Sequence, residues 1–390
     1  MGDPLFVDGL DFAVVLIVLL KVIVVFVFLL VAVMLMVWFE RKVISDMQSR
    51  IGPNRAGPWG ILQTLADGTK LFFKEDLLPD RADKIVFRLA PYLSILPAFA
   101  SFAVVPIGGT ISIASHETFL QLADPPIGVL FLLAMSSIAV YGVMLAGWSS
   151  GSKYPLLGSV RASAQMVSYE AAMALAVAAA VLNAGSLSTH DIVAAQDTFF
   201  HWGIFSLGVV PFVVFLIAAT AEANRPPFDL VEAEQELVGG FHTEYSSIRF
   251  ALFFLAEFMN TVTISAMVVT LFLGGPNRPA EFLPDWGILW FFVKLLVFLF
   301  IYVWLRATLP RFRYDQLMDL GWKKLIPASL FWLLLVAALR IGRLEDWFWG
   351  YVLAGGIAVG ALGWWTLSAA LALGQMDDAE LSDESLEVGS

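Results

Sequence analysis

Nine apolar segments, most of them long enough to cross a bilayer, decide what this chain can fold into. A helix needs roughly 20 apolar residues to span the hydrocarbon core. Backbone polar groups in lipid must be satisfied inside helices or closed barrels. The segments are residues 12–38, 91–108, 127–148, 161–183, 204–222, 248–273, 287–306, 325–342 and 348–373. The sequence therefore predicts an all-α polytopic membrane protein with about nine transmembrane helices.

The composition indicates one membrane domain rather than a series of soluble ones. Hydrophobic residues make up 59% of the chain and charged residues 15%. We expect a single domain over residues 1–374, with a first loop at 39–90 and an acidic loop at 223–247. Residues 375–390 form an acidic tail that contributes much of the net charge of −11, and its composition predicts disorder.

The basic residues predict the orientation. Most of the 23 lysine and arginine residues lie in or beside the loops that follow spans one, three, five and seven. Cytoplasmic loops carry the excess of positive charge. The N-terminus is therefore predicted outside, and nine spans would place the acidic tail in the cytoplasm.

The first loop contains a predicted amphipathic helix. Between Trp59 and Lys74, apolar residues recur at near-helical spacing with Asp67 and Lys70 between them. Such a segment is typical of a helix that lies along a membrane surface. A Gly-Pro-Asn turn at 52–54 precedes it.

A dense acidic stretch follows the fifth span. Carboxylates beside a bilayer are costly, so a cluster of them indicates function. Pro226 and Pro227 end the helix and predict irregular backbone there. The acids are Glu222, Asp229, Glu232, Glu234 and Glu236. The alternative is a solvated acidic loop.

Two further acids and one lysine fall inside predicted spans. Glu170 lies well within span four and Glu257 within span six. A buried carboxylate of this kind can exchange a proton near neutral pH. The alternatives are a helix–helix hydrogen bond by Glu170, and ion pairs of Glu222 and Glu257 with Lys294 or Arg249. Lys294 is expected to have an acidic partner or a water cavity.

The chain offers no ligands for a redox centre. It has no cysteine, which excludes disulfides and thiolate-bound iron–sulfur clusters. Its four histidines are scattered without metal-ligand spacing, so we predict no metal site. Any electrons must arrive on another subunit.

The combined motifs resemble the H subunit of the proton-translocating NADH–quinone oxidoreductase, respiratory complex I, which is the counterpart of the mitochondrial ND-one type. They cover roughly residues 10–342. The matching segments are Glu40-Arg41-Lys42, Arg50 to Arg55, Leu62 to Lys74, Ser163 to Glu170, Glu222 to Glu236, Glu244-Tyr245 and Arg306 to Gln316. The family usually has eight spans, so the ninth span and the tail carry no implied role.

The resemblance implies a membrane subunit that forms part of a quinone chamber and couples quinone reduction to proton translocation. The substrate would be ubiquinone or menaquinone. NADH and the iron–sulfur clusters would be on partner subunits, and this chain would bind no covalent or metal cofactor. The implied partners are quinone-site and iron–sulfur subunits of the peripheral arm, and small membrane subunits leading to antiporter-like ones, in a bacterial inner membrane. Nucleic acid is not among the expected partners.

The resemblance also implies two groups of site residues. The proton path comprises Tyr169, Glu170, Glu222, Asp229, Glu232, Glu234, Glu236, Glu257 and Lys294. The quinone-binding residues are Glu40, Arg41, Arg50, Asp67, Lys70, Phe72, Phe228 and Phe241. The alternative for the basic residues of the second group is that they set the positive-inside topology or dock to a partner subunit. For the loop from Arg306 to Asp315, docking onto the peripheral arm is as well supported as a quinone role.

Two other functions remain open from the sequence. The chain can be the anchor of a related membrane-bound hydrogenase or formate-linked complex. It can also be an independent secondary transporter using Glu170 and Lys294, although no inverted repeat is evident.

Overall fold

The chain is described here by a computed structural model. The structure describes residues 3–6, 9, 11–113, 116–230, 238–280, 282–344, 355, 356 and 358. Three acids of the acidic stretch, Glu232, Glu234 and Glu236, lie outside the described residues. So do nearly all of the ninth predicted span and the whole acidic tail.

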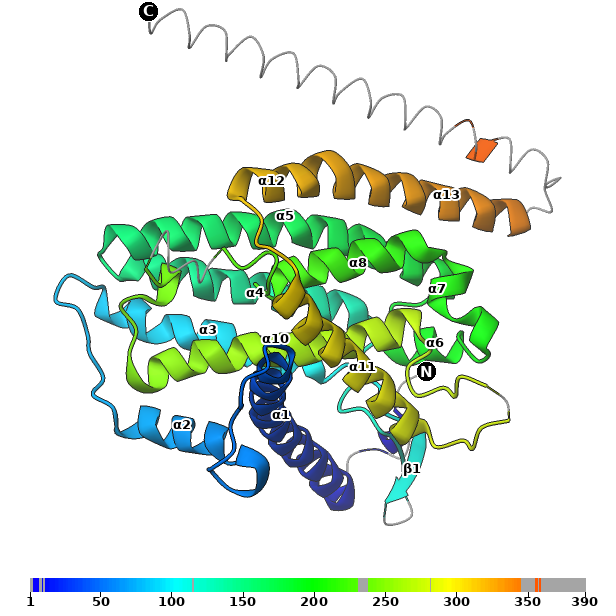
Figure 1. Cartoon of the computed structure of the whole chain (residues 1–390). Coiled ribbons are helices and arrows are strands. Elements are labelled where there is room, and N and C mark those ends of the chain that lie inside the picture. Colours follow the sequence, from blue (N-terminus) through cyan, green and yellow to red (C-terminus); the bar gives the residue numbers. More distant parts are fainter. Residues whose placement is uncertain are drawn as a thin grey trace, which may run out of the picture.

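Long helices account for most of the described residues (Figure 1). Their bounds are α1 Phe12–Met47, α3 Lys84–Phe102, α4 Gly128–Ser149, α5 Lys153–Ala184, α8 Val209–Glu222, α10 Ser247–Phe272, α11 Gly287–Thr308 and α13 Ile326–Leu344. In the described part of the chain, seven helices are long and apolar enough to cross a membrane. The prediction of an all-α polytopic fold is confirmed, whereas the number nine is not established.

Short elements connect these helices. The short α-helices are α2 Gln63–Phe73, α6 Thr189–Ala194, α7 Gly203–Ser206 and α12 Tyr314–Asp319. A π-helical turn, η5 Leu320–Leu325, joins α12 to α13. The 3-10 turns are η1 Pro4–Phe6, η2 Pro58–Gly60, η3 Phe199–His201 and η4 Gly240–His242. An antiparallel hairpin, β1 Thr110–Ile113 with β2 His116–Phe119, was not predicted.

The predicted second span needs a correction. It was expected at 91–108, but α3 begins at Lys84, where Asp83 accepts hydrogen bonds from the backbone N–H groups of Ile85 and Val86. Pro91 and Pro97 lie inside the helix instead of bounding it. Membrane helices tolerate interior proline because neighbouring groups satisfy the freed carbonyls. Here the hydroxyl of Tyr245 donates to the carbonyl of Phe87, four residues before Pro91.

The predicted fifth span, 204–222, is not one continuous helix. Gly208 has a φ of +84°, a conformation that favours glycine, and it separates α7 from α8. Within 4 Å of a Cβ placed there lies the Trp332 ring of α13, the nearest atom at 2.7 Å. The break therefore permits close packing, and α8 is left with only 14 residues.

The bundle is centred on α10. Helices α3, α4, α5, α8 and α10 lie side by side, α13 runs along α5, and α1 and α11 cross the bundle at an angle (Figure 1). In the most apolar 18-residue stretch of each helix, 67% of the residues of α10 are buried inside the protein, against 17% of those of α1. Small and polar residues are frequent in α10, whereas α1 is almost wholly Val, Leu, Ile and Phe. Large apolar residues such as those of α1 suit a helix face toward lipid, whereas small residues such as those of α10 suit close packing between helices.

The predicted amphipathic helix of the first loop is present as α2. None of its residues is fully buried, and Phe72 and Phe73 are exposed. Hydrogen bonds hold both ends of α2. Near its start, Thr64 donates to the carbonyl of Met34 in α1. Near its end, the carbonyl of Leu71 accepts from Ser247 at the start of α10. Helix α2 therefore lies beside the same end of the bundle as the start of α10.

Candidate functional site

The turn after α8 directs an arginine back into the bundle. Asn224 adopts a φ of +51°, and the two prolines that follow cannot continue a helix. The backbone N–H of Arg225 still donates to the carbonyl of Thr220. As a result the Arg225 side chain enters the protein, and the residue is only 4% exposed.

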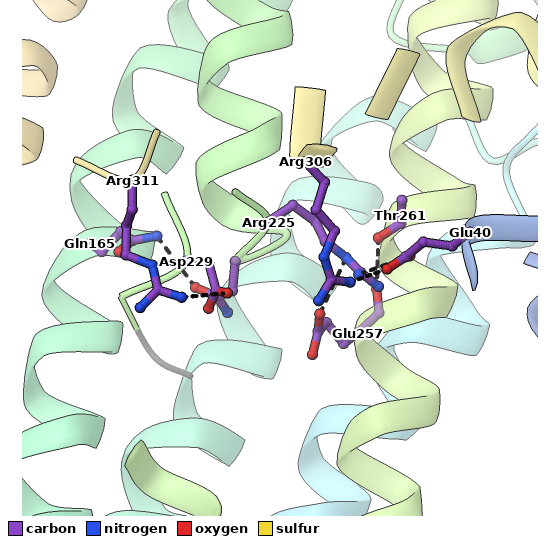
Figure 2. A network of polar contacts seen from close by, with 9 residues as sticks. Glu40, Gln165, Arg225, Asp229, Glu257, Thr261, Arg306 and Arg311 are labelled. Atoms are coloured by element: carbon purple, nitrogen blue, oxygen red, sulfur yellow. Dashed lines mark hydrogen bonds and ion pairs between the residues drawn. The ribbon is translucent and has the colours of Figure 1, made fainter. Parts of the chain in front are cut away.

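Arg225 bridges the buried carboxylate of Glu40 and the half-buried carboxylate of Glu257, which come from different helices (Figure 2). Its Nη1 lies 3.3 Å from Oε2 of Glu40 in α1, and its Nε lies 3.2 Å from Oε1 of Glu257 in α10. Arg306 of α11 forms a second ion pair with Glu40. Buried charges survive when they are paired and hydrogen-bonded. The network thus joins α1, α10, α11 and the turn after α8.

The guanidinium of Arg225 also has an aromatic contact. Its Cζ lies 4.0 Å from the ring centroid of Phe258, a cation–π distance. This contact adds a third interaction to the two ion pairs that hold the guanidinium.

Asp229 forms a separate ion pair a few residues further on. Arg311 Nη2 lies 3.3 Å from Asp229 Oδ2, and Asp229 is 4% exposed. Gln165 of α5 supports the same loop by donating to the carbonyls of Ala221 and Phe228 at 2.8 and 2.9 Å. The loop is therefore held between α5 and the segment after α11 (Figure 2).

Glu170 and Glu222 have a different kind of partner. Adjacent serines of α4 serve them: Ser136 donates to Glu222 and Ser137 donates to Glu170. Neither pair is an ion pair, because a hydroxyl carries no charge. A hydroxyl can donate to a carboxylate or accept from a protonated carboxyl group. These two acids can therefore be accommodated in either protonation state.

Glu222 lies on the shared wall of two cavities. One, of about 50 Å³, is also lined by Ser94, His242 and Glu257. The other, of about 30 Å³, is lined by Ser136 and Thr263. In the part of the chain that the structure describes, Ser94 Oγ, Thr263 Oγ1 and Glu222 Oε2 are buried without a hydrogen-bond partner. Polar atoms of this kind, facing a cavity, are where buried water is found.

The first loop brings together three of the expected quinone-binding residues. Arg41 and Asp67 form an ion pair at 2.6 Å, and Lys70 lies 3.9 Å from the same carboxylate. Gln63 donates to Asp67 as well. Arg50 is elsewhere in the loop, where it hydrogen-bonds Gln48. The pairing by α2 thus joins Arg41 with Asp67 and Lys70 but leaves out Arg50.

The three expected phenylalanines differ in exposure. Phe72 is exposed on α2, while Phe228 and Phe241 are buried. Phe228 packs against Phe312 and against Tyr169, whose hydroxyl donates to the carbonyl of Leu317. Tyr169 is thereby engaged with α12, so it does not share the serine-bonded arrangement of its neighbour Glu170.

Lys294 was expected to need an acid or a water cavity, and within the described residues the structure gives it neither. Its ammonium donates to the carbonyls of Leu273, Gly275 and Asn277 at 2.7, 2.9 and 2.7 Å. It also lies 4.1 Å from the ring centroid of Trp202. The carbonyl cage follows the C-terminus of α10, which attracts positive charge. Residue 273 is about 24 Å along the helix direction from Glu257, so Lys294 lies far from Glu257.

Sequence reasoning missed the groups that decide the state of the acids. Arg225, Ser136, Ser137 and Gln165 were not singled out, although all are visible in the sequence. The available signals were an arginine directly before two prolines and a Ser-Ser pair inside an apolar span. Among the described residues, no three His, Asp or Glu side chains are placed to hold a metal ion.

Comparison with known proteins identifies the family. Residues 20–337 match the family described as NADH dehydrogenase. A relative from Frankia casuarinae, named as the H subunit of NADH-quinone oxidoreductase, is 54% identical over 357 residues, covering 88% of this chain and 78% of the relative. A relative of the same name from Frankia alni is 53% identical over 353 residues, with the same coverage. The chain therefore belongs to the NADH dehydrogenase family, as a membrane subunit of the kind called the H subunit of NADH-quinone oxidoreductase.

Proposed function

We propose that this chain couples quinone reduction to proton translocation through Glu170 and Glu222. The observations that carry the proposal are the serine hydrogen bonds of both acids and the two cavities that share Glu222 as a wall. A buried carboxyl group with a hydroxyl partner and adjacent space for water can take up and release a proton. Neither acid has a cation in the described contacts that would fix its charge.

The arginine-paired acids have a different part in this proposal. Arg225 cannot lose its proton in a protein, so Glu40 and Glu257 are neutralised by its charge instead of by protonation. They act as fixed charges that set the potential near Glu222. Asp229, paired with Arg311, has the same role in the loop. Glu257 and Asp229 thus support the proton path without carrying the proton.

The quinone-binding part of the proposal rests on α2 and the end of α1. Arg41, held by Asp67, offers a guanidinium for the polar headgroup, and Lys70 adds positive charge beside it. Phe72 is exposed and available to an isoprenoid tail. Phe228 and Phe241 are packed inside the protein and support the chamber wall rather than touch the substrate.

Reduction of the quinone would act on the acidic loop by charge. Added negative charge at the chamber favours proton uptake by nearby acids. Asp229 and its Arg311 pair are the described start of that loop. We propose that the whole acidic loop responds to this charge. By their sequence position the loop also includes Glu232, Glu234 and Glu236.

The proposal assigns the remaining chemistry to partner subunits. NADH oxidation and iron–sulfur clusters belong to a peripheral arm, and small membrane subunits continue the path toward antiporter-like ones. The complex would lie in a bacterial inner membrane, with α2 and the turn after α8 on the cytoplasmic side. The printed names of the Frankia relatives favour this complex over a hydrogenase or formate-linked anchor.

The experiment compares two variants in the assembled complex. Glu222→Gln and Glu170→Gln keep size and hydrogen bonding but cannot exchange a proton. We expect both to lower quinone reduction and proton pumping together, by about tenfold or more, with normal assembly. The matched control is Glu117→Gln, an exposed acid of the hairpin. Full pumping by both variants would exclude these residues from the path.

A further inference from the structure

His242 lies on the wall of the larger cavity, together with Glu222 and Glu257. It ends η4, the turn that leads from the acidic loop toward α10. Gly240 has a φ of +58°, and a Cβ on Gly158 of α5 would come within 2.8 Å of the Gly240 backbone. This close approach of the turn to α5 sets the positions of Phe241 and His242 at the cavity.

The imidazole of His242 sits among aromatic rings. Its centroid is 5.0 Å from that of Phe241 and 5.3 Å from that of Phe250, and both contacts are edge-to-face. Burial lowers the pKa of His242 to about 4, while the charge of Asp229 acts in the opposite direction. The ring is therefore neutral near pH 7, with one nitrogen that donates and one that accepts.

The acidic groups that face this ring come from three segments. Asp229 lies on the side of the acidic loop, Glu222 at the end of α8, and Glu257 on α10. Glu257 and Asp229 are held by arginines. Of the three, only Glu222 has a hydroxyl as its described side-chain partner. A proton that leaves His242 across the cavity therefore has Glu222 as its acceptor.

We propose that His242 relays protons across the cavity between the segment around Asp229 and Glu222. The bare ring nitrogen takes up a proton from the loop side, and the opposite N–H releases one toward Glu222, directly or through cavity water. The imidazole is neutral before and after the transfer, so one proton enters and one leaves. This inference rests on the proposed function of Glu222 and adds the group that supplies it.

The alternative is that His242 only fills space in a cluster of phenylalanines. His242→Phe keeps an aromatic ring there but removes both nitrogens, and His242→Ala opens the space for a small added base. Imidazole restores such a base, whereas pyrazole has nearly the same size and is a far weaker base. The matched control is His190→Phe, because His190 is half-buried and stacked on Phe119, away from this cavity.

The test measures quinone reduction and proton pumping by the whole complex in proteoliposomes. We expect His242→Phe and His242→Ala to lose about tenfold in both, and His190→Phe to be unchanged. Added imidazole should raise the rate of His242→Ala severalfold, while pyrazole should not, and neither should affect His242→Phe. Wild-type rates in His242→Phe, or equal rescue of His242→Ala by both rings, would overturn the relay.

The same preparation separates this inference from the proposed function. If Glu222→Gln loses pumping but the His242 variants do not, only the relay is wrong. If Glu222→Gln pumps normally, the proposed proton path is wrong as well. If His242→Ala does not assemble, His242→Gln is measured instead, and a normal pumping rate in that variant overturns the relay.

Discussion

Two pairs of buried or half-buried glutamates in this chain have opposite kinds of partner. Glu40 and Glu257 share the guanidinium of Arg225, with Arg306 also on Glu40. Glu170 and Glu222 accept from the adjacent hydroxyls of Ser137 and Ser136. A guanidinium compensates a negative charge permanently, while a hydroxyl serves the charged and the neutral carboxyl alike. We propose that the partner, more than membrane depth, distinguishes a structural acid from a proton carrier.

Lys294 extends the comparison to a buried cation. Three backbone carbonyls and the Trp202 ring surround its ammonium, with no carboxylate among its described contacts. It compensates the end of α10 and the loop behind it. A charge held in that way stabilises one loop conformation, and we propose that Lys294 has this structural role.

The largest effect is expected from breaking the arginine bridge. Arg225→Met leaves two carboxylates without their shared cation, and removing one partner of a buried pair costs about 3–5 kcal/mol. We expect little assembled complex in membranes, measured on native gels. Arg313→Met is the control, because Arg313 pairs with Asp315 at the exposed surface. Normal assembly and melting of Arg225→Met would show that the bridge is not structural.

A somewhat smaller loss is expected from removing the caged cation. Lys294→Met leaves three carbonyls without their donor, and each unsatisfied buried group costs about 1–3 kcal/mol before the loop relaxes. The melting temperature of the complex should fall, while the protons pumped per electron pair should not change. Lys323→Met, at an exposed pair with Asp319, is the control. A changed pumping ratio would return Lys294 to the proton path.

Removing a serine should affect rate more than stability. Ser136→Ala deletes one hydrogen bond to Glu222, worth about 1 kcal/mol, which corresponds to roughly a fivefold change in rate. We expect normal assembly with quinone reduction and pumping lowered by that factor. Ser265→Ala is the control, because this buried hydroxyl bonds the carbonyl of Thr261 within its own helix. Equal rates in the two variants would contradict a role for the hydroxyl at Glu222.

An effect that leaves the rate at pH 7 aside is expected in the pH dependence of stability. The pKa of His242 is lowered by burial from 6.5 to about 4. Between these values the unfolded chain binds a proton that the folded chain does not, so stability falls as the pH drops from 6.5 toward 4. Wild type should therefore lose free energy of unfolding between pH 7 and pH 5. Because the ring is only partly buried, we expect His242→Gln to lose about 1–2 kcal/mol less of it over the same range.

The measurement is the melting temperature of the detergent-solubilised complex at the two pH values. His190→Gln should behave as wild type. If His242→Gln loses as much stability as wild type between pH 7 and pH 5, the imidazole is not held neutral by its surroundings.

The helical class and the approximate spans were predictable because long apolar runs have few alternatives in a bilayer. The boundaries were less predictable, because they depend on packing. The second span was predicted to begin at residue 91, yet α3 begins at Lys84 and continues through Pro91. The break at Gly208 follows from contact with Trp332, a residue more than a hundred positions away.

The acids of the site were predictable from the sequence. Which of them pair with arginine and which hydrogen-bond to serine was not predictable. Sequence position shows that Glu170, Glu222 and Glu257 lie in or beside spans. Only the fold brings Arg225 to Glu257 and the serines of α4 to Glu222 and Glu170. The cage of Lys294 was equally hidden, because backbone carbonyls have no signature in the sequence.

Infrared difference spectroscopy of the complex during quinone reduction tests the division of the acids most directly. Protonation of a buried carboxyl group produces a C=O band that an ionised carboxylate lacks. We predict that a band of this kind changes on reduction in wild type, disappears when Glu170→Gln and Glu222→Gln are combined, and persists in Glu257→Gln. Persistence in the combined variant, or its loss in Glu257→Gln with Glu170 and Glu222 intact, would contradict the account.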